Sequence, residues 1–387
     1  MNRHIFVGMQ ILNHNQWLKE HAVVVEDGTI TAIISAHMVT HHLPANMHHF
    51  PENYYLSPGL IDLHIHGAAN HDVMDGRIEA LHAISRSLAS KGITGFLATT
   101  MTASNDQLEA ALRTIPLAMQ TLEGAEILGV HLEGPFLSKE KIGAQNSRYV
   151  QHPNIALIHH WQKIACDTIK LITLAPELPH AIEFIQQLDT LGILASIGHT
   201  NATYEETRSA IQAGCKHATH LFNAMHHLHQ REPGAIGALL MANDVTAELI
   251  VDGIHLHPAI VELALRCKSK ENLVLVSDAM RATCLGDGQF DLGGQLVEVT
   301  RGKASLSDGT LAGSTLCLPQ AIKNMQQFTH CSLIDAITMA SFNPARILHL
   351  DRRKGSIEIG KDADLIILNE ACDVILTMRG GKELDWR

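Results

Sequence analysis

The 387-residue sequence has no apolar run that approaches the roughly 18 residues of a membrane-spanning helix, and its first residues alternate like a strand and lack a signal-peptide core. It also has no excess of positive charge, and a net charge of −11 argues against a general nucleic-acid or anionic-membrane binder. The seven cysteines are scattered without a Cys-x-x-Cys pair, which is typical of free thiols in a reducing compartment. These absences predict a cytoplasmic protein without nucleic-acid or membrane partners.

The composition that is present suits a large folded core. Hydrophobic residues make up 46% of the chain, an ordinary share for a globular protein. Because 387 residues are many for one compact unit, we expect one large domain with a smaller companion.

The stretch 58–67, which reads PGLIDLHIHG, joins a turn signal to an almost unbroken apolar run. Such a run fits a strand that is buried on both faces, as in a parallel sheet covered by helices. It ends with His64 and His66, and residues two apart in a strand point to the same side. The two imidazoles can therefore face one point, although paired histidines without a special role are common in a chain that contains 27 of them.

Strand-like and helix-like segments alternate after residue 58. Apolar residues recur at helical spacing at Ile78, Leu81, Ile84 and Leu88, and strand-like runs cover 92–100, 127–135, 169–177, 193–200, 217–224, 247–255 and 272–279. With the opening strand these runs give eight βα units, which predicts a (β/α)₈ TIM-type barrel. A doubly wound open sheet is the alternative. The barrel is favoured because polar residues end nearly every run, where barrel enzymes keep their active sites.

Both ends of the chain contain short strand-like segments joined by turns. Asp27-Gly28 predicts a hairpin, and the polar, histidine-rich residues 37–53 predict a surface loop. Strands at the two ends need partners that neither end supplies alone, so the ends should pair with each other. We therefore expect a small β-sandwich domain from residues 1–57 and 346–387, and a barrel from residues 58–345.

Potential metal ligands lie at the ends of several predicted strands. They are His64 and His66 on the first, Glu133 on the third, His199 on the fifth and His220 on the sixth. Imidazole and carboxylate together suit a divalent first-row ion such as zinc, with an open position for water. Each residue alone could equally be a hydrogen-bonded histidine or a helix-capping acid, but their number at equivalent strand ends favours a metal site.

Asp278, at the end of the eighth predicted strand, has the chemistry of a general base. A divalent ion can lower the pKa of bound water from about 15.7 to about 7, and a neighbouring carboxylate can take a proton during attack and return it to the leaving group. Hydrolysis of a C–N bond is the natural reaction of such an arrangement.

A second group of residues is suited to an anion. Asn223, Arg231 and His255 follow the sixth and seventh predicted strands. A guanidinium is planar and permanently charged, which favours phosphate recognition. The alternative for Arg231 is a surface ion pair with Glu232.

Together these motifs resemble those of the N-acetylglucosamine-6-phosphate deacetylase family, within the amidohydrolase superfamily. The matching stretches run in order over most of the chain: PGLIDLHIHG, GVHLEGPFL, LAPE, IGHTNA, ATHLFNAM, REPGAIG, VDGIH, SDAM, GTLAGS, NPAR and GKDADL. The resemblance implies a metal-bearing barrel that hydrolyses N-acetylglucosamine 6-phosphate to glucosamine 6-phosphate and acetate, as a homodimer. It also implies the roles of the site residues: the main ion at Glu133, His199 and His220; Asp278 as general base and acid; and a sugar-phosphate site at Ala144, Asn223, Ala224, Arg231, His255, Leu311, Ala312 and Gly313.

Three features bear on this resemblance. Some family members lack this His-x-His pair and use one ion; the chain keeps both His64 and His66, so it has ligands for a second ion, and the sequence leaves one or two ions open. Gln145 stands where several members carry a histidine near the substrate carbonyl. The fourth predicted strand ends in Leu-Ala-Pro-Glu without a lysine, unlike relatives whose two ions are bridged by a carbamylated lysine.

Two other functions were weighed. The same chemistry on N-acetylgalactosamine 6-phosphate differs by the orientation of one hydroxyl, and the sequence leaves both sugars open. A non-catalytic barrel that serves as a scaffold should have lost metal ligands or Asp278, and this chain retains them all.

Overall fold

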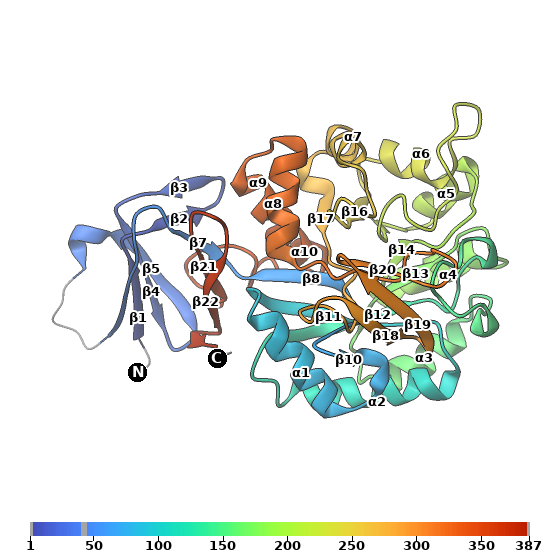
Figure 1. Cartoon of the computed structure of the whole chain (residues 1–387), viewed down its shortest axis with the longest axis horizontal. Coiled ribbons are helices and arrows are strands. Elements are labelled where there is room, and N and C mark those ends of the chain that lie inside the picture. Colours follow the sequence, from blue (N-terminus) through green and yellow to red (C-terminus); the bar gives the residue numbers. More distant parts are fainter. Residues whose placement is uncertain (1–2, 40–44, 385–387) are drawn as a thin grey trace.

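The computed structural model describes residues 3–39 and 45–384 and places a small β-rich part beside a larger α/β part (Figure 1). Strands from both ends of the chain, blue and red in the picture, lie together in the small part. The segments between them form the larger part.

Eight parallel strands form the centre of the larger part. In chain order they are β8 (Leu60–Ile65), β11 (Ile93–Thr100), β12 (Glu126–Glu133), β13 (Ile169–Leu174), β14 (Leu194–Ile197), β15 (His217–Ala218), β16 (Thr246–Leu249) and β17 (Leu273–Leu275). The sheet closes where Ile65 bridges Ala279, with hydrogen bonds from Asp278 N to His64 O (3.0 Å) and from His66 N to Ala279 O (2.9 Å). The predicted (β/α)₈ barrel is confirmed, and the open sheet is wrong.

Helices surround the barrel strands (Figure 1). They are α1 (Ile78–Ala89), α2 (Asn105–Met119), α3 (Ile155–Ile164), α4 (Ala181–Thr190), α5 (Tyr204–Gln212), α6 (Gly234–Met241), α7 (Pro258–Lys268), α8 (Leu318–Thr329), α9 (Leu333–Ala340) and α10 (Phe342–Ile347). The apolar stripe of Ile78, Leu81, Ile84 and Leu88 packs α1 onto the barrel core, as its spacing predicted. Strand and helix side chains thus share one large hydrophobic core.

Several barrel strands are shorter than the apolar runs in the sequence. β14, β15 and β17 end two or three residues before His199, His220 and Asp278, respectively. At those three residues the backbone is left-handed, with φ of 48°, 29° and 50°. Such a conformation costs a non-glycine residue on the order of 1–3 kcal/mol. The three side chains therefore project from turns at the barrel mouth rather than from the strands themselves.

The small part consists of two sheets. One has the order β5 (Thr29–Ser35), β4 (His21–Glu26), β1 (Arg3–Val7) and β6 (Asn46–His49); the other has the order β23 (Lys382–Glu383), β22 (Val374–Arg379), β21 (Leu365–Leu368), β7 (Tyr55–Pro58), β2 (Gln10–Asn13) and β3 (Gln16–Leu18). β21 from the C-terminal end pairs antiparallel with β7 from the N-terminal end. Apolar side chains of both sheets, among them Phe6, Val23, Leu56 and Leu365, share a second core, as in a sandwich.

Two local predictions in this region have different outcomes. The hairpin at Asp27-Gly28 is confirmed between β4 and β5. The surface loop at residues 37–53 is wrong in part, because β6 lies within it and pairs parallel with β1. The ring of His48 stacks on Phe6 at 4.5 Å between centroids, so this histidine packs like an aromatic residue. Residues 40–44 of the predicted loop lie outside the described residues.

We propose the division into residues 1–57 with 346–387 and residues 58–345 as the domain organisation.

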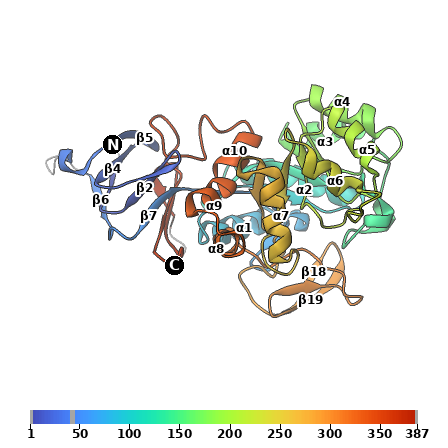
Figure 2. The same cartoon turned by 90° about the horizontal axis from the view of Figure 1, so that it is seen from above.

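A three-stranded antiparallel sheet, which the sequence patterns did not predict, is inserted after the last barrel strand. Its strands are β18 (Gly288–Leu292), β19 (Gln295–Thr300) and β20 (Lys303–Ser305), and it projects from one side of the barrel (Figure 2). A small core that includes Met101, Met280 and Leu292 fastens it to the barrel. Gln295 Nε2 donates to Ala144 O at 2.5 Å, so the inserted sheet also holds a loop at the barrel mouth.

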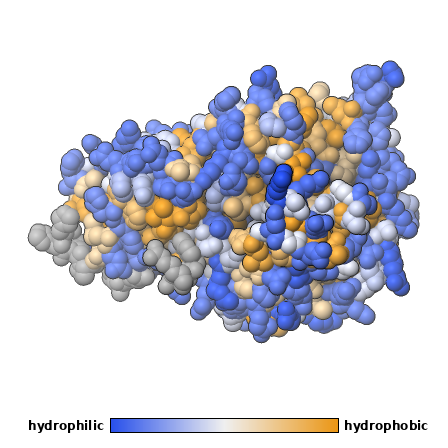
Figure 3. Space-filling view, viewed as in Figure 1, coloured by the Kyte–Doolittle hydropathy of each residue, from blue (hydrophilic) through white to orange (hydrophobic). Residues whose placement is uncertain are grey.

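No helix within residues 3–39 and 45–384 is long and apolar enough to cross a membrane. Figure 3 shows hydrophilic residues over most of one face, with hydrophobic patches between them.

Lys354 connects the two parts of the molecule. Only 2% of its side chain is exposed, and its Nζ lies 2.6 Å from Asp364 Oδ2, beside β21, and 2.8 Å from Glu126 Oε2, at the start of barrel strand β12. A buried charge is stable only when an opposite charge and hydrogen bonds match it. This ammonium group is therefore a structural link between the C-terminal strands and the barrel.

We expect Lys354→Met to lower the free energy of unfolding by about 3–5 kcal/mol, because it leaves the buried Asp364 carboxylate without its cation. Chemical denaturation followed by circular dichroism measures this loss. The control is Lys323→Met, which removes a surface pair at 2.6 Å with Asp373. An exposed pair contributes at most about 1 kcal/mol. Equal losses in the two variants would contradict the structural role of Lys354.

Candidate active site

A cavity of about 600 Å³ opens at the C-terminal ends of the barrel strands. Many of the residues singled out from the sequence line it: His66, Glu133, Ala144, His199, His220, Asn223, Ala224, His255, Asp278, Leu311 and Gly313. His64 is fully buried directly behind this wall. The closed barrel thus brings together residues that are up to 249 positions apart, from His64 to Gly313.

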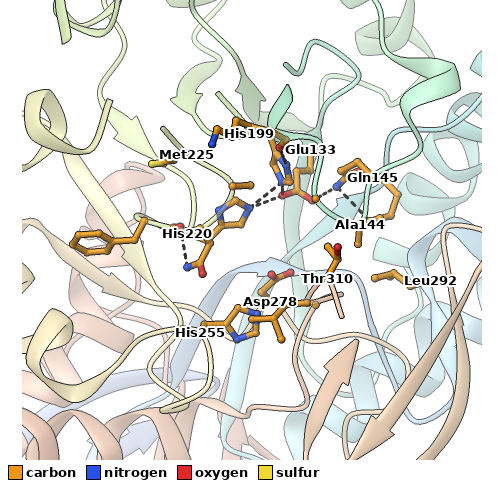
Figure 4. A pocket seen from close by; sticks show the side chains of 18 of the residues that line it. Glu133, Ala144, Gln145, His199, His220, Met225, His255, Asp278, Leu292 and Thr310 are labelled. Carbon is orange, nitrogen blue, oxygen red and sulfur yellow. Dashed lines mark hydrogen bonds and ion pairs between the residues drawn. The ribbon is translucent and has the colours of Figure 1, made fainter. Parts of the chain in front are cut away.

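The Glu133 carboxylate, at the end of β12, lies at the centre of a histidine cluster (Figure 4). Its Oε1 is 3.0 Å from His199 Nε2 and 3.0 Å from His220 Nε2. Its Oε2 is 3.1 Å from His66 Nε2, and His64 Nε2 lies 3.5 Å from Oε1. Glu133 therefore faces both predicted ligand groups, with Oε1 near His64, His199 and His220 and Oε2 near His66.

The hydrogen bonds of the histidines test whether this cluster suits a cation. His199 Nδ1 lies 3.0 Å from Lys141 O, and a carbonyl can only accept, so Nδ1 carries the proton and Nε2 presents a lone pair. That lone pair points at a carboxylate oxygen and at the Nε2 of His220, 3.1 Å away. Electron pairs facing one another at such distances are favourable only around a positive charge. The residues fit a divalent ion at Glu133, His199 and His220.

His64 and His66 form a second possible ligand group with Glu133. Their Nε2 atoms are 3.3 Å apart. Burial lowers the pKa of both rings, but the Asp278 and Glu133 carboxylates outweigh it and hold the pKa of His64 well above its ordinary value and that of His66 at about 9. The cluster therefore attracts positive charge strongly, whether as protons or as a metal ion.

Asp278 is the remaining carboxylate at the barrel mouth. Its Oδ1 lies 3.3 Å from His66 Nε2 and 3.5 Å from His64 Nε2, and only 8% of the residue is exposed. Burial raises the pKa of Asp278, but the neighbouring His64 and His66 outweigh it and bring the pKa below the ordinary value. The carboxylate is therefore ionised at neutral pH and able to accept a proton.

The residues predicted to bind an anion are only partly brought together. His255 lines the cavity, and its Nδ1 donates to Asp252 Oδ2 at 2.6 Å, which leaves Nε2 available. Asn223 also lines the cavity, but its Nδ2 donates to His220 O at 3.2 Å. Arg231 is exposed, on a loop outside the cavity wall.

Leu311 and Gly313 line the cavity, whereas Ala312 between them does not. Its side chain is buried in the small core beneath the inserted sheet, and its N–H donates to Ala304 O at 3.2 Å. The predicted role of the Ala312 backbone in binding substrate is therefore limited to its carbonyl group.

Two contributors to the site were not recognised from the sequence. Glu248 in β16 accepts a hydrogen bond from His64 Nδ1 at 3.0 Å, and the carbonyl of Lys141 holds His199. The position of Glu248 near the start of a predicted strand could have indicated a residue inside the barrel. The Lys141 contact is made by the backbone, so no side-chain signal exists for it.

Gln145, whose role the sequence left open, contacts the cluster directly. Its Nε2 donates to Glu133 Oε2 at 2.5 Å, and its Oε1 accepts from Thr102 N at 2.7 Å. The amide therefore fixes the orientation of the Glu133 carboxylate from the side opposite His199.

Comparison with known proteins agrees with this geometry. The amidohydrolase family model matches residues 55–384. The chain is 44% identical over 329 residues to the N-acetylglucosamine-6-phosphate deacetylase of Lysinibacillus sphaericus, covering 85% of each chain. It is 35% identical to the N-acetylgalactosamine-6-phosphate deacetylase of Escherichia coli O157:H7, covering 96% of each.

Among solved structures, N-acetylglucosamine-6-phosphate deacetylase from Pasteurella multocida superimposes with a TM-score of 0.93 at 30% identity, covering 98% of this chain and 99% of that one. The chain belongs to the amidohydrolase family. Its relatives place it among the N-acetylglucosamine-6-phosphate deacetylases of that family, as the motifs implied. Members of an enzyme family that retain the ligand cluster and the cavity are expected to be active, which argues against a scaffold.

We expect Glu133→Ala to lose both the bound divalent ion and activity, because the Glu133 carboxylate contacts the Nε2 atoms of both histidine pairs. Elemental analysis of the purified protein measures the first effect and turnover the second. The control is Glu123→Ala, at an exposed position before β12. Full turnover of the wild-type protein after exhaustive chelation, with no divalent ion bound, would contradict a metal site.

Proposed function

We propose that this chain hydrolyses the acetamide of N-acetylglucosamine 6-phosphate to glucosamine 6-phosphate and acetate. The observation that carries the proposal is the convergence of Glu133, His199 and His220 with the ionised Asp278 on one cavity at the barrel mouth. The names of its relatives supply the substrate.

The ion is proposed to be zinc, held by Glu133, His199 and His220, with a possible second ion at His64 and His66. Such an ion supplies Lewis acidity and lowers the pKa of bound water to about 7. Imidazole and carboxylate ligands are those that zinc commonly has in catalytic sites. Gln145 and the carbonyl of Lys141 hold Glu133 and His199 in place from outside the ligand set.

Asp278 is proposed to move the proton. It accepts a proton from the attacking water as the water oxygen bonds to the acetamide carbon. It then donates that proton to the amide nitrogen as the C–N bond breaks, so that the neutral amine and acetic acid are formed. The acid then gives its remaining proton to the amine or to water and becomes acetate. Its position 3.3 Å from His66 Nε2 places the carboxylate beside the ligand cluster, where the water would be held.

Binding of the sugar phosphate is proposed for the outer part of the cavity. The residues proposed for it that line the cavity are Ala144, Asn223, Ala224, His255, Leu311 and Gly313, and Ala312 would contribute backbone alone. Arg231 is exposed and does not line the cavity, so its proposed contact with the phosphate rests on the family resemblance. Remote binding energy of this kind can raise kcat by fixing the acetamide over the reactive groups.

The galacto epimer is the second candidate substrate, because one relative is named for it. An acetate-release assay on N-acetylglucosamine 6-phosphate, N-acetylgalactosamine 6-phosphate and the two unphosphorylated sugars decides between them, with metal content measured on the same sample. Fastest release from the phosphorylated gluco sugar is expected. Preference for the galacto sugar would reverse the assignment, and no release from any sugar would overturn the function.

We also propose a homodimer in the cytoplasm, which sedimentation and cell fractionation would test. All seven cysteines are free, in keeping with a reducing compartment.

We expect Asp278→Asn to lower kcat by about 10²–10⁴-fold while KM changes little, because the amide cannot accept the proton. Steady-state kinetics on the phosphorylated sugar measure the effect. The control is Asp106→Asn, an exposed residue at the start of α2. Near-normal kcat in Asp278→Asn would assign the proton transfer to another group, with His255 the next candidate.

We expect Arg231→Ala to lower kcat/KM for the phosphorylated sugar by about one to two orders of magnitude, since a hydrogen bond to a charged group contributes about 1.5–3 kcal/mol. Unphosphorylated N-acetylglucosamine should be almost unaffected, because it offers nothing for the guanidinium to bind. Kinetics of both substrates with wild type and variant measure the difference. Equal losses would make Arg231 a structural residue, and no loss for either sugar would remove it from the phosphate site.

A further inference from the structure

Glu248 is a carboxylate inside the barrel that the mechanism above does not use. It lies in β16, is fully buried and does not line the cavity. Burying an ionised carboxylate costs several kcal/mol unless donors compensate it. The donors that compensate the Glu248 carboxylate therefore indicate its role beneath the active site.

Its two oxygens accept three hydrogen bonds. Oε2 accepts from His64 Nδ1 at 3.0 Å and from the backbone N–H of His220 at 3.0 Å. Oε1 lies 3.2 Å from His217 Nε2, and the other ring nitrogen of His217 lies 2.6 Å from Thr246 Oγ1. One oxygen of Glu248 thus contacts residues of both predicted ligand groups, His64 on β8 and His220 directly after β15.

The contact with His64 determines which nitrogen of that ring faces the cavity. An ionised carboxylate can only accept, so the proton of a neutral His64 ring stays on Nδ1. Nε2 then carries the lone pair on the side where Glu133 Oε1 lies, 3.5 Å away. With the opposite tautomer, an N–H group would point at the site and His64 would be unable to bind an ion.

The contact with His220 supports a backbone conformation that is costly by itself. The φ of His220 is 29°, in the left-handed region. Its ring Nδ1 makes no hydrogen bond among the described residues, so no side-chain contact on that nitrogen orients the ring. The bond from its backbone N–H to Glu248 is therefore a principal constraint on where this ligand lies.

We propose that Glu248 is a positioning residue that orients His64 and His220 as metal ligands from beneath the site. The inference rests on the proposed function only in assigning these histidines to a metal site. Hydrogen-bond partners behind ligands of this kind typically change metal affinity by about 10–100-fold when they are replaced.

The test uses zinc and cobalt binding rather than turnover. Full-length protein is freed of metal with a chelator, and Zn²⁺ binding is measured by calorimetry for wild type, Glu248→Gln, His64→Asn and the double variant. The visible spectrum of the Co²⁺-loaded proteins reports ligand geometry. The control is Asp364→Asn, which alters another buried carboxylate, one that binds Lys354 far from any proposed ligand.

We expect Glu248→Gln to lower the affinity for one zinc ion by about 10–100-fold, and this ion should be the one whose affinity His64→Asn also lowers. The variant should also change the cobalt spectrum. The double variant should bind that ion no more weakly than His64→Asn alone. Asp364→Asn should lower the unfolding midpoint but leave zinc affinity and the cobalt spectrum unchanged. If Glu248→Gln fails to fold, Glu248→Asp, which retracts the carboxylate by one methylene group, should give the same spectral change.

Wild-type zinc affinity and spectrum in the Glu248 variants would overturn the inference. The inference would also be overturned if the losses in zinc affinity of Glu248→Gln and His64→Asn were fully additive in the double variant. The same holds if His64→Asn weakened the binding of no zinc ion. Acetate release by the wild-type protein is measured separately, so the proposed function can survive a negative result here.

Discussion

Negative charge buried at the mouth of a closed barrel is the constraint on which this site depends. Glu133, Asp278 and Glu248 are almost entirely removed from water, and the pKa of each lies below its ordinary value although burial acts in the opposite direction. The histidines around them supply compensating donors, but a neutral His199 ring, with its proton on Nδ1 toward Lys141 O, presents a lone pair to Glu133. A cation between these atoms would be attracted by both the carboxylate and the lone pair. The metal site and the stability of the barrel mouth therefore depend on the same buried charges.

The same barrel closure supports a backbone that is unfavourable locally. His199, His220 and Asp278 all have left-handed φ values, and each is held by a backbone hydrogen bond to another part of the barrel. Ser138 N donates to His199 O at 2.9 Å, His220 N to Glu248 at 3.0 Å and Asp278 N to His64 O at 3.0 Å. Because the strands end before these residues, the backbone there can turn, and the three side chains point into the cavity. Strain of a few kcal/mol is thus distributed over the connections that close the barrel.

Sequence patterns predicted the barrel and the ligand cluster because both depend on local signals. Alternating apolar runs mark buried strands, and histidines or acids directly after them meet at one end of a closed sheet. The contacts of Glu248 and Lys141 were not predictable in that way, since one depends on which wall of the barrel faces which and the other is a backbone carbonyl. The inserted sheet β18–β20 was missed because its strands are short, although Gly293-Gly294 between β18 and β19 is a hairpin signal and Val297 and Val299 alternate with polar residues. Arg231 was grouped with His255 from its order in the chain, whereas the structure places it on an exposed loop.

The predicted residues and the missed ones belong to different parts of the site. Groups proposed to act on the amide lie on or directly after barrel strands, where the closed sheet fixes their spacing and where burial strengthens their interactions. Groups proposed to recognise the sugar phosphate lie on loops, and Gln295 of the inserted sheet restrains one of those loops through Ala144 O. Changes in the loops can therefore alter which sugar is accepted without disturbing the buried charges. Such a separation is compatible with the similarity of this chain to relatives named for the gluco and for the galacto sugar.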